Sequence, residues 1–169
     1  MRCQTRLTCA HAPMRKSSLR KKTTAVLAGV GAVTALTVAV SPADAASSFT
    51  PRNGATGKCL AGWSGHTVAQ AHCGDASTSW SWVEAGTNRG MYKNTSTGMC
   101  LDTNGDGVYL SPCNSADGGQ VWGTWDGCTL WKNHVYNRYL TGWNTGTVSM
   151  RNYNDVDSVS KQHWFGQPC

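Results

Sequence analysis

The sequence predicts an all-β domain made of three similar units of about forty residues each. The same residues recur at the same spacing in each copy. An asparagine stands six residues before a residue pair that ends in leucine: Asn53 before Cys59-Leu60, Asn94 before Cys100-Leu101, and Asn133 before Tyr139-Leu140. Fixed-period similarity indicates one supersecondary unit used three times, each too small to bury its apolar face alone. After residue 45 no stretch keeps a helical apolar period over three turns, and turn residues interrupt the chain almost every ten residues, which favours short strands.

The rest of each unit follows the same order. A valine comes next (Val68, Val108, Val148), and a tryptophan closes each copy, which we assign to Trp82, Trp122 and Trp164. Two copies share a Gln-x-Trp motif, Gln120-Val121-Trp122 and Gln162-His163-Trp164, and we interpret Trp80-Ser81-Trp82 as its degraded form in the first copy. The predicted repeats span about 50–86, 87–126 and 127–169.

The first 45 residues are predicted to be a signal peptide. A basic stretch leads into an apolar run from Thr23 to Val40, and Ala43-Asp44-Ala45 is a small-x-small cleavage site. Met14 is an alternative start, because the segment from Met14 to Ala45 has all three parts of a signal peptide. A membrane span is the lesser alternative for the apolar run. We therefore expect a secreted, extracellular domain spanning residues 46–169, with no stable membrane insertion.

Removal of the leader abolishes the positive charge of the chain. Of the 15 Lys and Arg residues 8 remain, and of the 9 acidic residues 8 remain, so the net charge of residues 46–169 is zero. The formal charge of +6 for the whole chain therefore gives no support for a nucleic-acid partner, and we expect none.

Six cysteines remain in residues 46–169, an even number that predicts three disulfides in an exported chain. Cys59 with Cys73 and Cys100 with Cys113 occupy equivalent places in two copies, so they are expected to pair locally. The remaining two, Cys128 and Cys169, would then join. Tyr139 and Tyr153 stand at the places of a cysteine pair in the third copy, where we expect packed rings.

About four short strands per copy are expected, such as Gly107 to Ser111, Cys128 to Lys132 and Thr145 to Met150. Three four-stranded units can close on themselves with threefold pseudo-symmetry, which removes exposed sheet edges.

The order Cys100-Leu101-Asp102, Val108, Cys113 and Gln120-Val121-Trp122 resembles the repeat of ricin-type β-trefoil lectins, of the small secreted bacterial type. The resemblance covers about Thr50 to Trp164 in three copies. It implies a β-trefoil with up to three shallow sugar pockets, one per copy, for galactose- or xylose-type glycans.

The resemblance also implies which residues would bind sugar. In the second copy these are Asp102 as the acid and Gln120 as its support, while Ser111 replaces the usual aromatic platform and Gly119 replaces a common asparagine. Tyr109 is at another position that contacts sugar in some members. The outer copies lack the acid, having Ala61 and Thr141, and they have Ala71 and Arg151 at the platform position.

The outer copies share a different feature, Gly62-Trp63 and Gly142-Trp143, at the place where the second copy has Asn104. Either each tryptophan covers its own part of the barrel rim, or the two are relocated stacking platforms or protein contacts. We therefore include Trp63, Trp143 and Asn104 among the candidate carbohydrate-binding residues.

Metal and catalytic motifs do not favour another function. The segment Asp102 to Gly107 matches the opening of a calcium loop, but its twelfth position is Cys113 instead of glutamate. No nucleophile motif occurs, and Glu84 is the only glutamate after residue 45. We predict a carbohydrate-binding module with no catalysis, cofactor or metal. The alternative is a protein-interaction trefoil with eroded sugar sites, working in a secreted toxin or enzyme complex.

Overall fold

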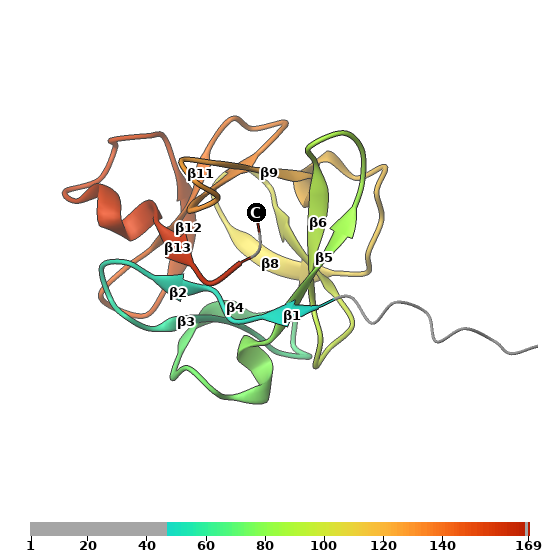
Figure 1. Cartoon of the computed structure of the whole chain (residues 1–169), viewed down its shortest axis with the longest axis horizontal. Coiled ribbons are helices and arrows are strands. Elements are labelled where there is room, and N and C mark those ends of the chain that lie inside the picture. The colour runs from blue at the N-terminus through green and yellow to red at the C-terminus, as the bar shows by residue number, and fades with distance from the viewer. Residues whose placement is uncertain (1–46, 168) are drawn as a thin grey trace, which may run out of the picture. The chain divides into compact units, whose positions relative to one another are not determined.

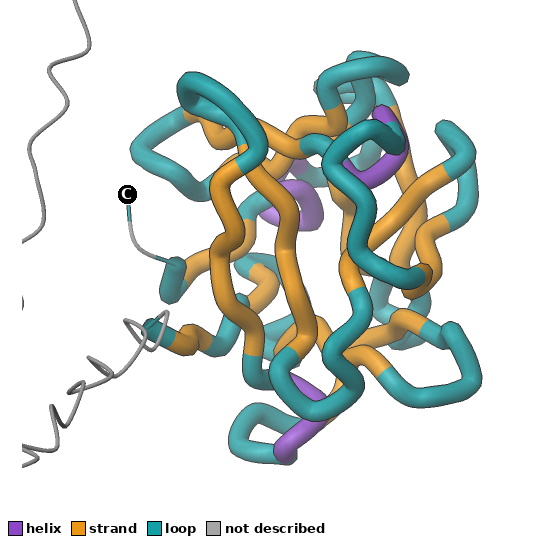
Figure 2. Tube along the Cα trace, turned by 90° about the vertical axis from the view of Figure 1, so that its right-hand side faces the viewer, coloured by secondary structure: helices purple, strands orange, loops and turns teal. Residues whose placement is uncertain are grey.

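The computed structural model describes residues 47–167 and Cys169, so the predicted signal peptide lies outside the described residues. The described chain is built from strands and loops, and its helical residues are confined to three short 3-10 turns (Figures 1 and 2). The strands are β1 (Ser48–Phe49), β2 (Arg52–Asn53), β3 (Cys59–Gly62), β4 (Val68–Ala71), β5 (Trp80–Glu84), β6 (Gly90–Asn94), β7 (Cys100–Thr103), β8 (Val108–Ser111), β9 (Trp122–Trp125), β10 (Leu130–Asn133), β11 (Tyr139–Gly142), β12 (Val148–Arg151) and β13 (Trp164–Phe165). The 3-10 turns are η1 (Ala76–Thr78), η2 (Gly118–Gln120) and η3 (Val159–Gln162).

The same order of elements occurs three times: a strand, a two-stranded hairpin, a 3-10 turn and a strand, and in the first copy the opening strand is divided into β1 and β2. The first and last strands of the three copies form a closed barrel. The adjacent strands in it are β1 and β5, β5 and β6, β6 and β9, β9 and β10, and β13 and β2. A bridge between Leu130 and His163 joins β10 to the start of β13. Closure in this way leaves few strand edges open to pairing with other chains.

The three hairpins, β3–β4, β7–β8 and β11–β12, join each other in a ring of equivalent hydrogen bonds. The amide of Leu110 donates to the carbonyl of His66, that of Met150 to Asp106, and that of Gln70 to Gly146, at 3.0, 2.9 and 2.7 Å. Each hairpin thus donates to its predecessor, and the first donates to the third. This ring confirms the predicted threefold pseudo-symmetry.

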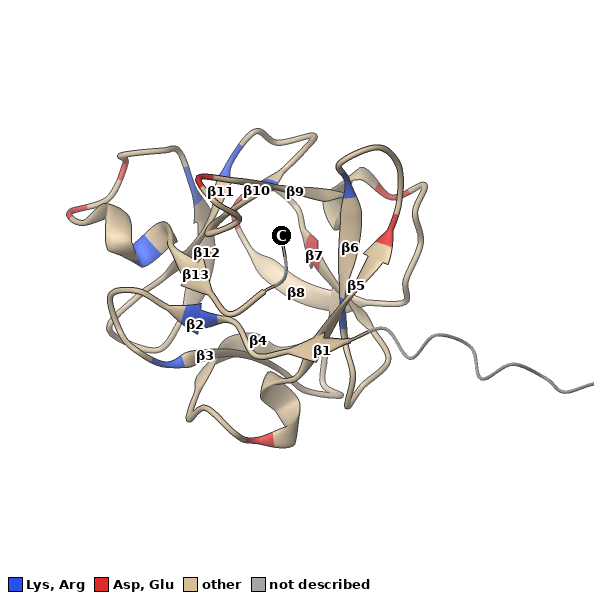
Figure 3. Cartoon of the chain, in the orientation of Figure 1, with Lys and Arg blue, Asp and Glu red and all other residues tan. Residues whose placement is uncertain are grey.

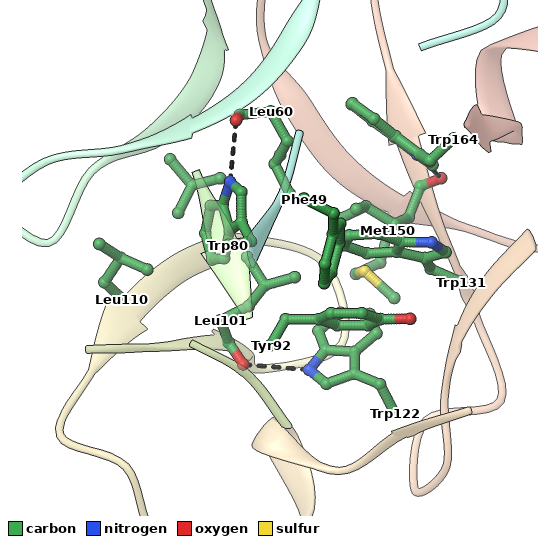
Figure 4. Packing of buried hydrophobic residues seen from close by; sticks show 12 residues of the cluster. Phe49, Leu60, Trp80, Tyr92, Leu101, Leu110, Trp122, Trp131, Met150 and Trp164 are labelled. Carbon is green, nitrogen blue, oxygen red and sulfur yellow. Dashed lines mark hydrogen bonds between the residues drawn. The ribbon is translucent and has the colours of Figure 1, made fainter. Parts of the chain in front are cut away.

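The centre of the barrel is filled by aromatic side chains (Figure 4), and equivalent tryptophans hold the hairpins to it. The indole Nε1 atoms of Trp80, Trp122 and Trp164 donate to the carbonyl oxygens of Leu60, Leu101 and Leu140, at 2.9, 3.0 and 3.0 Å. All three indoles are fully buried.

The closing tryptophan of the first copy is therefore Trp80, and the assignment to Trp82 was wrong. The motif in that copy is Thr78-Ser79-Trp80, with Thr78 at the end of η1 as Gln120 is at the end of η2. Trp82 lies two residues further along β5, half-buried, and its ring packs at 5.0 Å against Tyr92. Two tryptophans on one face of a strand allowed either one to be aligned with the motif.

The recurrent asparagines connect successive copies. Asn53, Asn94 and Asn133 are buried, and each side-chain amide donates to carbonyl oxygens in or beside the 3-10 turn of the preceding copy. Asn53, at the start, contacts the last turn through the carbonyl of Lys161 at 2.8 Å. These amides satisfy carbonyl groups that the short turns leave without a partner, which explains why the asparagines recur.

The predicted disulfides are confirmed. Cys59–Cys73, Cys100–Cys113 and Cys128–Cys169 are bonded. Tyr139 and Tyr153 pack with ring centroids 5.5 Å apart, as expected for the third copy.

The predicted strands match the structure unevenly. Gly107 to Ser111 corresponds to β8, whereas Cys128 to Lys132 and Thr145 to Met150 begin two or three residues too early, since β10 begins at Leu130 and β12 at Val148. Within the described residues, no helix is long and apolar enough to cross a membrane.

Candidate functional site

Asp102, the acid of the second copy, lies on β7 and accepts hydrogen bonds from groups on β7, β8 and η2. Its Oδ1 accepts a 2.6 Å hydrogen bond from the amide of Thr103, and its Oδ2 accepts from Ser111 Oγ at 2.5 Å and from Gln120 Nε2 at 3.3 Å. Only 3% of the residue is exposed. Three donors satisfy the buried carboxylate, so its oxygens are occupied by the protein itself.

Gly119 completes this enclosure, because a Cβ at its position would lie 2.4 Å from Asp102 Oδ1 and 2.5 Å from the carbonyl oxygen of Thr103. A larger residue there cannot fit while Asp102 keeps its place. The glycine that replaces the usual asparagine is therefore a packing requirement of the second copy.

Tyr109 and Asn104 belong to the same hairpin as the enclosed acid. Tyr109 lies opposite Asp102 in the β7–β8 pairing and is half-buried. The pKa of Tyr109 is raised, first by partial burial of its hydroxyl and then by the negative charge of Asp102. Asn104 is exposed, but its Oδ1 accepts from the amides of Asp106 and Gly107 at 3.2 and 2.9 Å and so shapes the hairpin turn.

The first copy offers an exposed indole on a surface without the usual polar groups. Trp63 follows β3 and is 40% exposed. Ala61 and Ala71 occupy the acid and platform positions, and Thr78 occupies the position of the glutamine. Of the predicted sugar contacts, this copy keeps only an aromatic surface.

The third copy contains a pocket of about 570 Å³ at its hairpin. Its lining is an indole, an amide, three hydroxyls, one aliphatic side chain and two cationic side chains: Trp143, Asn144, Thr145, Thr147, Ser149, Val148, Arg151 and Lys161. Arg151 faces Tyr139 across β11–β12, as Ser111 faces Cys100 in the second copy. The pocket thus occupies the place where the resemblance implies a sugar site.

Two cations converge on the indole of Trp143. The guanidinium carbon of Arg151 lies 5.5 Å from the ring centroid and Lys161 Nζ lies 4.9 Å from a ring centroid. The Nε1 atom of Trp143 donates to Ser149 Oγ at 2.8 Å, which fixes the ring. In Figure 3 the short helix η3 carries one of the cations, beside β13, whereas acidic positions lie in the loop that precedes it.

Lys161 also pairs with Asp157, with 2.6 Å between Nζ and Oδ1. The lysine side chain is 9% exposed and the aspartate side chain 73%. The pKa of Asp157 is lowered, chiefly because Lys161 donates a hydrogen bond to its carboxylate. The aspartate holds the ammonium group at the pocket edge while remaining in solvent.

A second pocket, of about 720 Å³, lies at the end of the barrel beside the β5–β6 and β9–β10 connections. Trp82 and Trp125 line it, and Trp82 Nε1 donates to Glu84 Oε1 at 2.8 Å. Gly90 and Gly123 leave room for the two indoles, since a Cβ at either would lie within 2.8 Å of a ring.

The segment that resembles a calcium loop is committed to other contacts. Asp106 forms an ion pair with Arg138, and Asn104 bonds the turn amides. Within residues 47–167 and Cys169, no group of three or more His, Cys, Asp or Glu side chains is placed to hold a metal ion.

Several solved structures are similar to the chain, although no family model and no curated protein matches it. The designed three-fold symmetric protein ThreeFoil matches with a TM-score of 0.61 at 18% identity, over 72% of this chain and 99% of its own. SeviL bound to the asialo-GM1 saccharide matches at 0.58 and 16%, over 71% and 95%, and the Haemophilus ducreyi cytolethal distending toxin at 0.59 and 18%, over 75% and 86%. The chain is a β-trefoil. At these identities the likeness concerns the fold alone.

The candidate residues of this β-trefoil form separate groups. Asp102 and Gln120 are in direct contact, with Tyr109 opposite Asp102 on β8, whereas Trp63 and Trp143 belong to the other two copies. Sequence comparison missed Lys161 as a pocket residue. Its signal was its position before Gln162, where the resemblance implies a residue that supports the site.

Proposed function

We propose that this β-trefoil is an exported carbohydrate-binding module with no catalysis of its own, and that the Trp143 pocket in the third copy is its principal site. The observation that supports this most strongly is the composition of the pocket, in which hydroxyl, amide and cationic groups surround an indole. Sugars present hydroxyls and an apolar C–H face, which such a mixture of groups can bind.

The second copy is proposed as a further site that opens on binding. Asp102 would accept hydrogen bonds from sugar hydroxyls, Gln120 would orient it, and Tyr109 and Asn104 would flank the ligand. Ser111 must first give up its 2.5 Å bond to the acid. Unchanged glycan-array binding by Asp102→Asn would refute this role.

Trp63 is proposed as an aromatic contact of the first copy. Single shallow sites of this kind bind weakly, and several sites on one chain raise the overall affinity through effective concentration. The resemblance to ricin-type lectins implies galactose- or xylose-type glycans as ligands. SeviL, a structure of the same fold, is bound to a saccharide, which agrees with this class of ligand.

A glycan array probed with the secreted chain tests the proposal. We expect binding that free sugar competes away and that Trp143→Ala lowers at least tenfold. Trp125→Ala is the matched control, because it removes an exposed indole outside the pocket. Equal loss in both variants, or no binding to any glycan, would contradict the proposal, and absence of turnover of a labelled polysaccharide would support a non-catalytic role.

The second candidate function is a protein-interaction module in a secreted complex, and the barrel-end pocket favours it. Trp125 is 43% exposed there, and aromatic residues are common anchors in protein interfaces. The cytolethal distending toxin shares the fold. A partner recovered with the chain from culture fluid, lost with Trp125→Ala and retained with Trp143→Ala, would support this function over carbohydrate binding.

A further inference from the structure

We propose that the Trp143 pocket selects acidic saccharides, whose carboxylate or sulfate group binds between Arg151 and Lys161. This inference rests on the proposed carbohydrate-binding function. It specifies in addition that the ligand is negatively charged, whereas the resemblance implies neutral galactose- or xylose-type glycans.

The charges of the pocket favour an anion. Arg151 comes from β12 and Lys161 from η3, and none of the described residues that line the pocket carries a carboxylate. Asp157 faces Lys161 from the loop before η3, so the group carries two positive charges and one negative charge. An anionic ligand would supply the second negative charge.

The third copy differs from the others at the positions that matter. Where the second copy has Asp102 it has Thr141, which is buried and uncharged. Arg151 occupies the place of Ser111, and Lys161 precedes Gln162 as Gly119 precedes Gln120. The usual acid is thus absent and two cations are present, an inversion of charge found in this copy alone.

Both cations are held in place before a ligand arrives. Lys161 is largely buried beside Trp143 and is tethered by Asp157. Arg151 Nη1 donates to the carbonyl oxygen of Met150 at 2.7 Å, which orients the guanidinium group. An arginine held through one nitrogen can still present others to a carboxylate or sulfate in paired geometry. Preorganised groups lose less conformational entropy on binding.

The neutral groups of the pocket fit the rest of a sugar. Thr145 and Thr147 share a 2.9 Å hydrogen bond at its exposed edge, and Asn144 lies beside them. These side chains can exchange bonds with ring hydroxyls while the anion remains at the cations. A bare inorganic anion would leave them unused, so a saccharide should bind more tightly than free sulfate.

Calorimetry or an array with three matched oligosaccharides tests the inference: neutral galactose oligomers, galacturonate oligomers and sulfated galactose oligomers. We expect at least one acidic series to bind roughly tenfold more tightly than the neutral series at low salt, and the two acidic series separate carboxylate from sulfate recognition. Higher salt should reduce the preference, because ions screen it.

Variants assign the preference to the pocket. Arg151→Gln should bring acidic oligomers to the level of neutral ones, and Asp157→Asn should strengthen acidic binding several-fold by freeing Lys161. Lys93→Gln, an exposed change of the same charge on β6, is the control and should change neither series. Arg151 is preferred to Lys161 as the variant, because Lys161 is buried and ion-paired.

The outcomes are distinct. Trp143-dependent binding of neutral oligomers with no acidic preference would overturn this inference and leave the proposed function intact. Equal loss of acidic binding in Arg151→Gln and Lys93→Gln would show nonspecific attraction of polyanions, which also overturns it. No binding of any oligosaccharide would refute the proposed function itself.

Discussion

The indole of Trp80 donates a 2.9 Å hydrogen bond to the carbonyl oxygen of Leu60, and this bond identifies the closing tryptophan of the first copy. Trp80 is fully buried, whereas Trp82, two residues later, is only partly buried. The bond crosses from the barrel strand β5 to the hairpin strand β3. It therefore couples the two parts of the copy, as its equivalents do in the others.

Trp80→Phe is expected to destabilise the fold far more than Trp82→Phe. The first change leaves the carbonyl of Leu60 buried without its donor and opens a small cavity, so it should lower the free energy of unfolding by about 2–4 kcal/mol. The second should cost less than about 1.5 kcal/mol, because the indole is near solvent. Denaturant unfolding of both variants measures the difference, and the reverse order would restore Trp82 as the closing residue.

The enclosed carboxylate gives a second prediction. Asp102→Asn puts a hydrogen-bond donor in place of an acceptor, since the new amide nitrogen must face either the Thr103 amide or Gln120 Nε2, which are themselves donors. We expect a loss of about 1–3 kcal/mol of unfolding free energy. Asp155→Asn, an exposed change of the same kind, should stay within about 0.5 kcal/mol. Equal stability of the two variants would mean that Asp102 is not buried in solution.

The anchors that repeat with the fold were predictable from the sequence, because each satisfies a geometric need three times. The turn of the preceding copy is hydrogen-bonded by Asn53, Asn94 and Asn133. The two cysteine pairs at equivalent positions close the equivalent hairpins of the first and second copies. A need that recurs at fixed spacing is visible in one sequence. The threefold architecture and all three disulfides therefore followed from it.

The tryptophan of the first copy was misassigned because spacing alone does not determine it. The three indoles stand 20, 21 and 24 residues after the leucines that they bond, since the intervening loops differ in length. With Trp80 and Trp82 two residues apart, either fits that variation. Only the bond to Leu60 and the position of η1 decide between them.

The sequence also hid the character of the candidate site. Comparison of copies placed Arg151 at the platform position, but it does not show that Lys161 from η3 reaches the same indole as Arg151 from β12. Nor does it show that Asp102 is enclosed by Ser111 and Gly119. Contacts of this kind depend on how a 3-10 turn packs against a hairpin, which the order of residues in one sequence does not specify.

Gly119→Ala tests the enclosure from the other side. The added methyl group would collide with Asp102 Oδ1 and the Thr103 carbonyl, so we expect a loss of about 1–3 kcal/mol or more in unfolding free energy. Gly65→Ala is the control, because the nearest atom to a Cβ there is Thr67 Oγ1 at 3.8 Å. That variant should be neutral or slightly stabilising. Equal effects in thermal unfolding would show that the Asp102 pocket adapts freely.

The buried hydroxyl of Tyr92 is expected to lower the free energy of unfolding at alkaline pH. Its hydroxyl is buried, which raises its pKa well above 10.0, while the 2.8 Å hydrogen bond with Gln167 acts in the opposite direction. The folded state therefore keeps a proton that the unfolded chain loses. The stabilisation is complete below pH 10 and falls by up to about 1.4 kcal/mol per pH unit above it, until the folded pKa is reached. Tyr92→Phe removes this titration, so its unfolding free energy should decline less than that of the unaltered chain between pH 9 and 11.5. Parallel declines in denaturant titrations would show that Tyr92 ionises equally in both states.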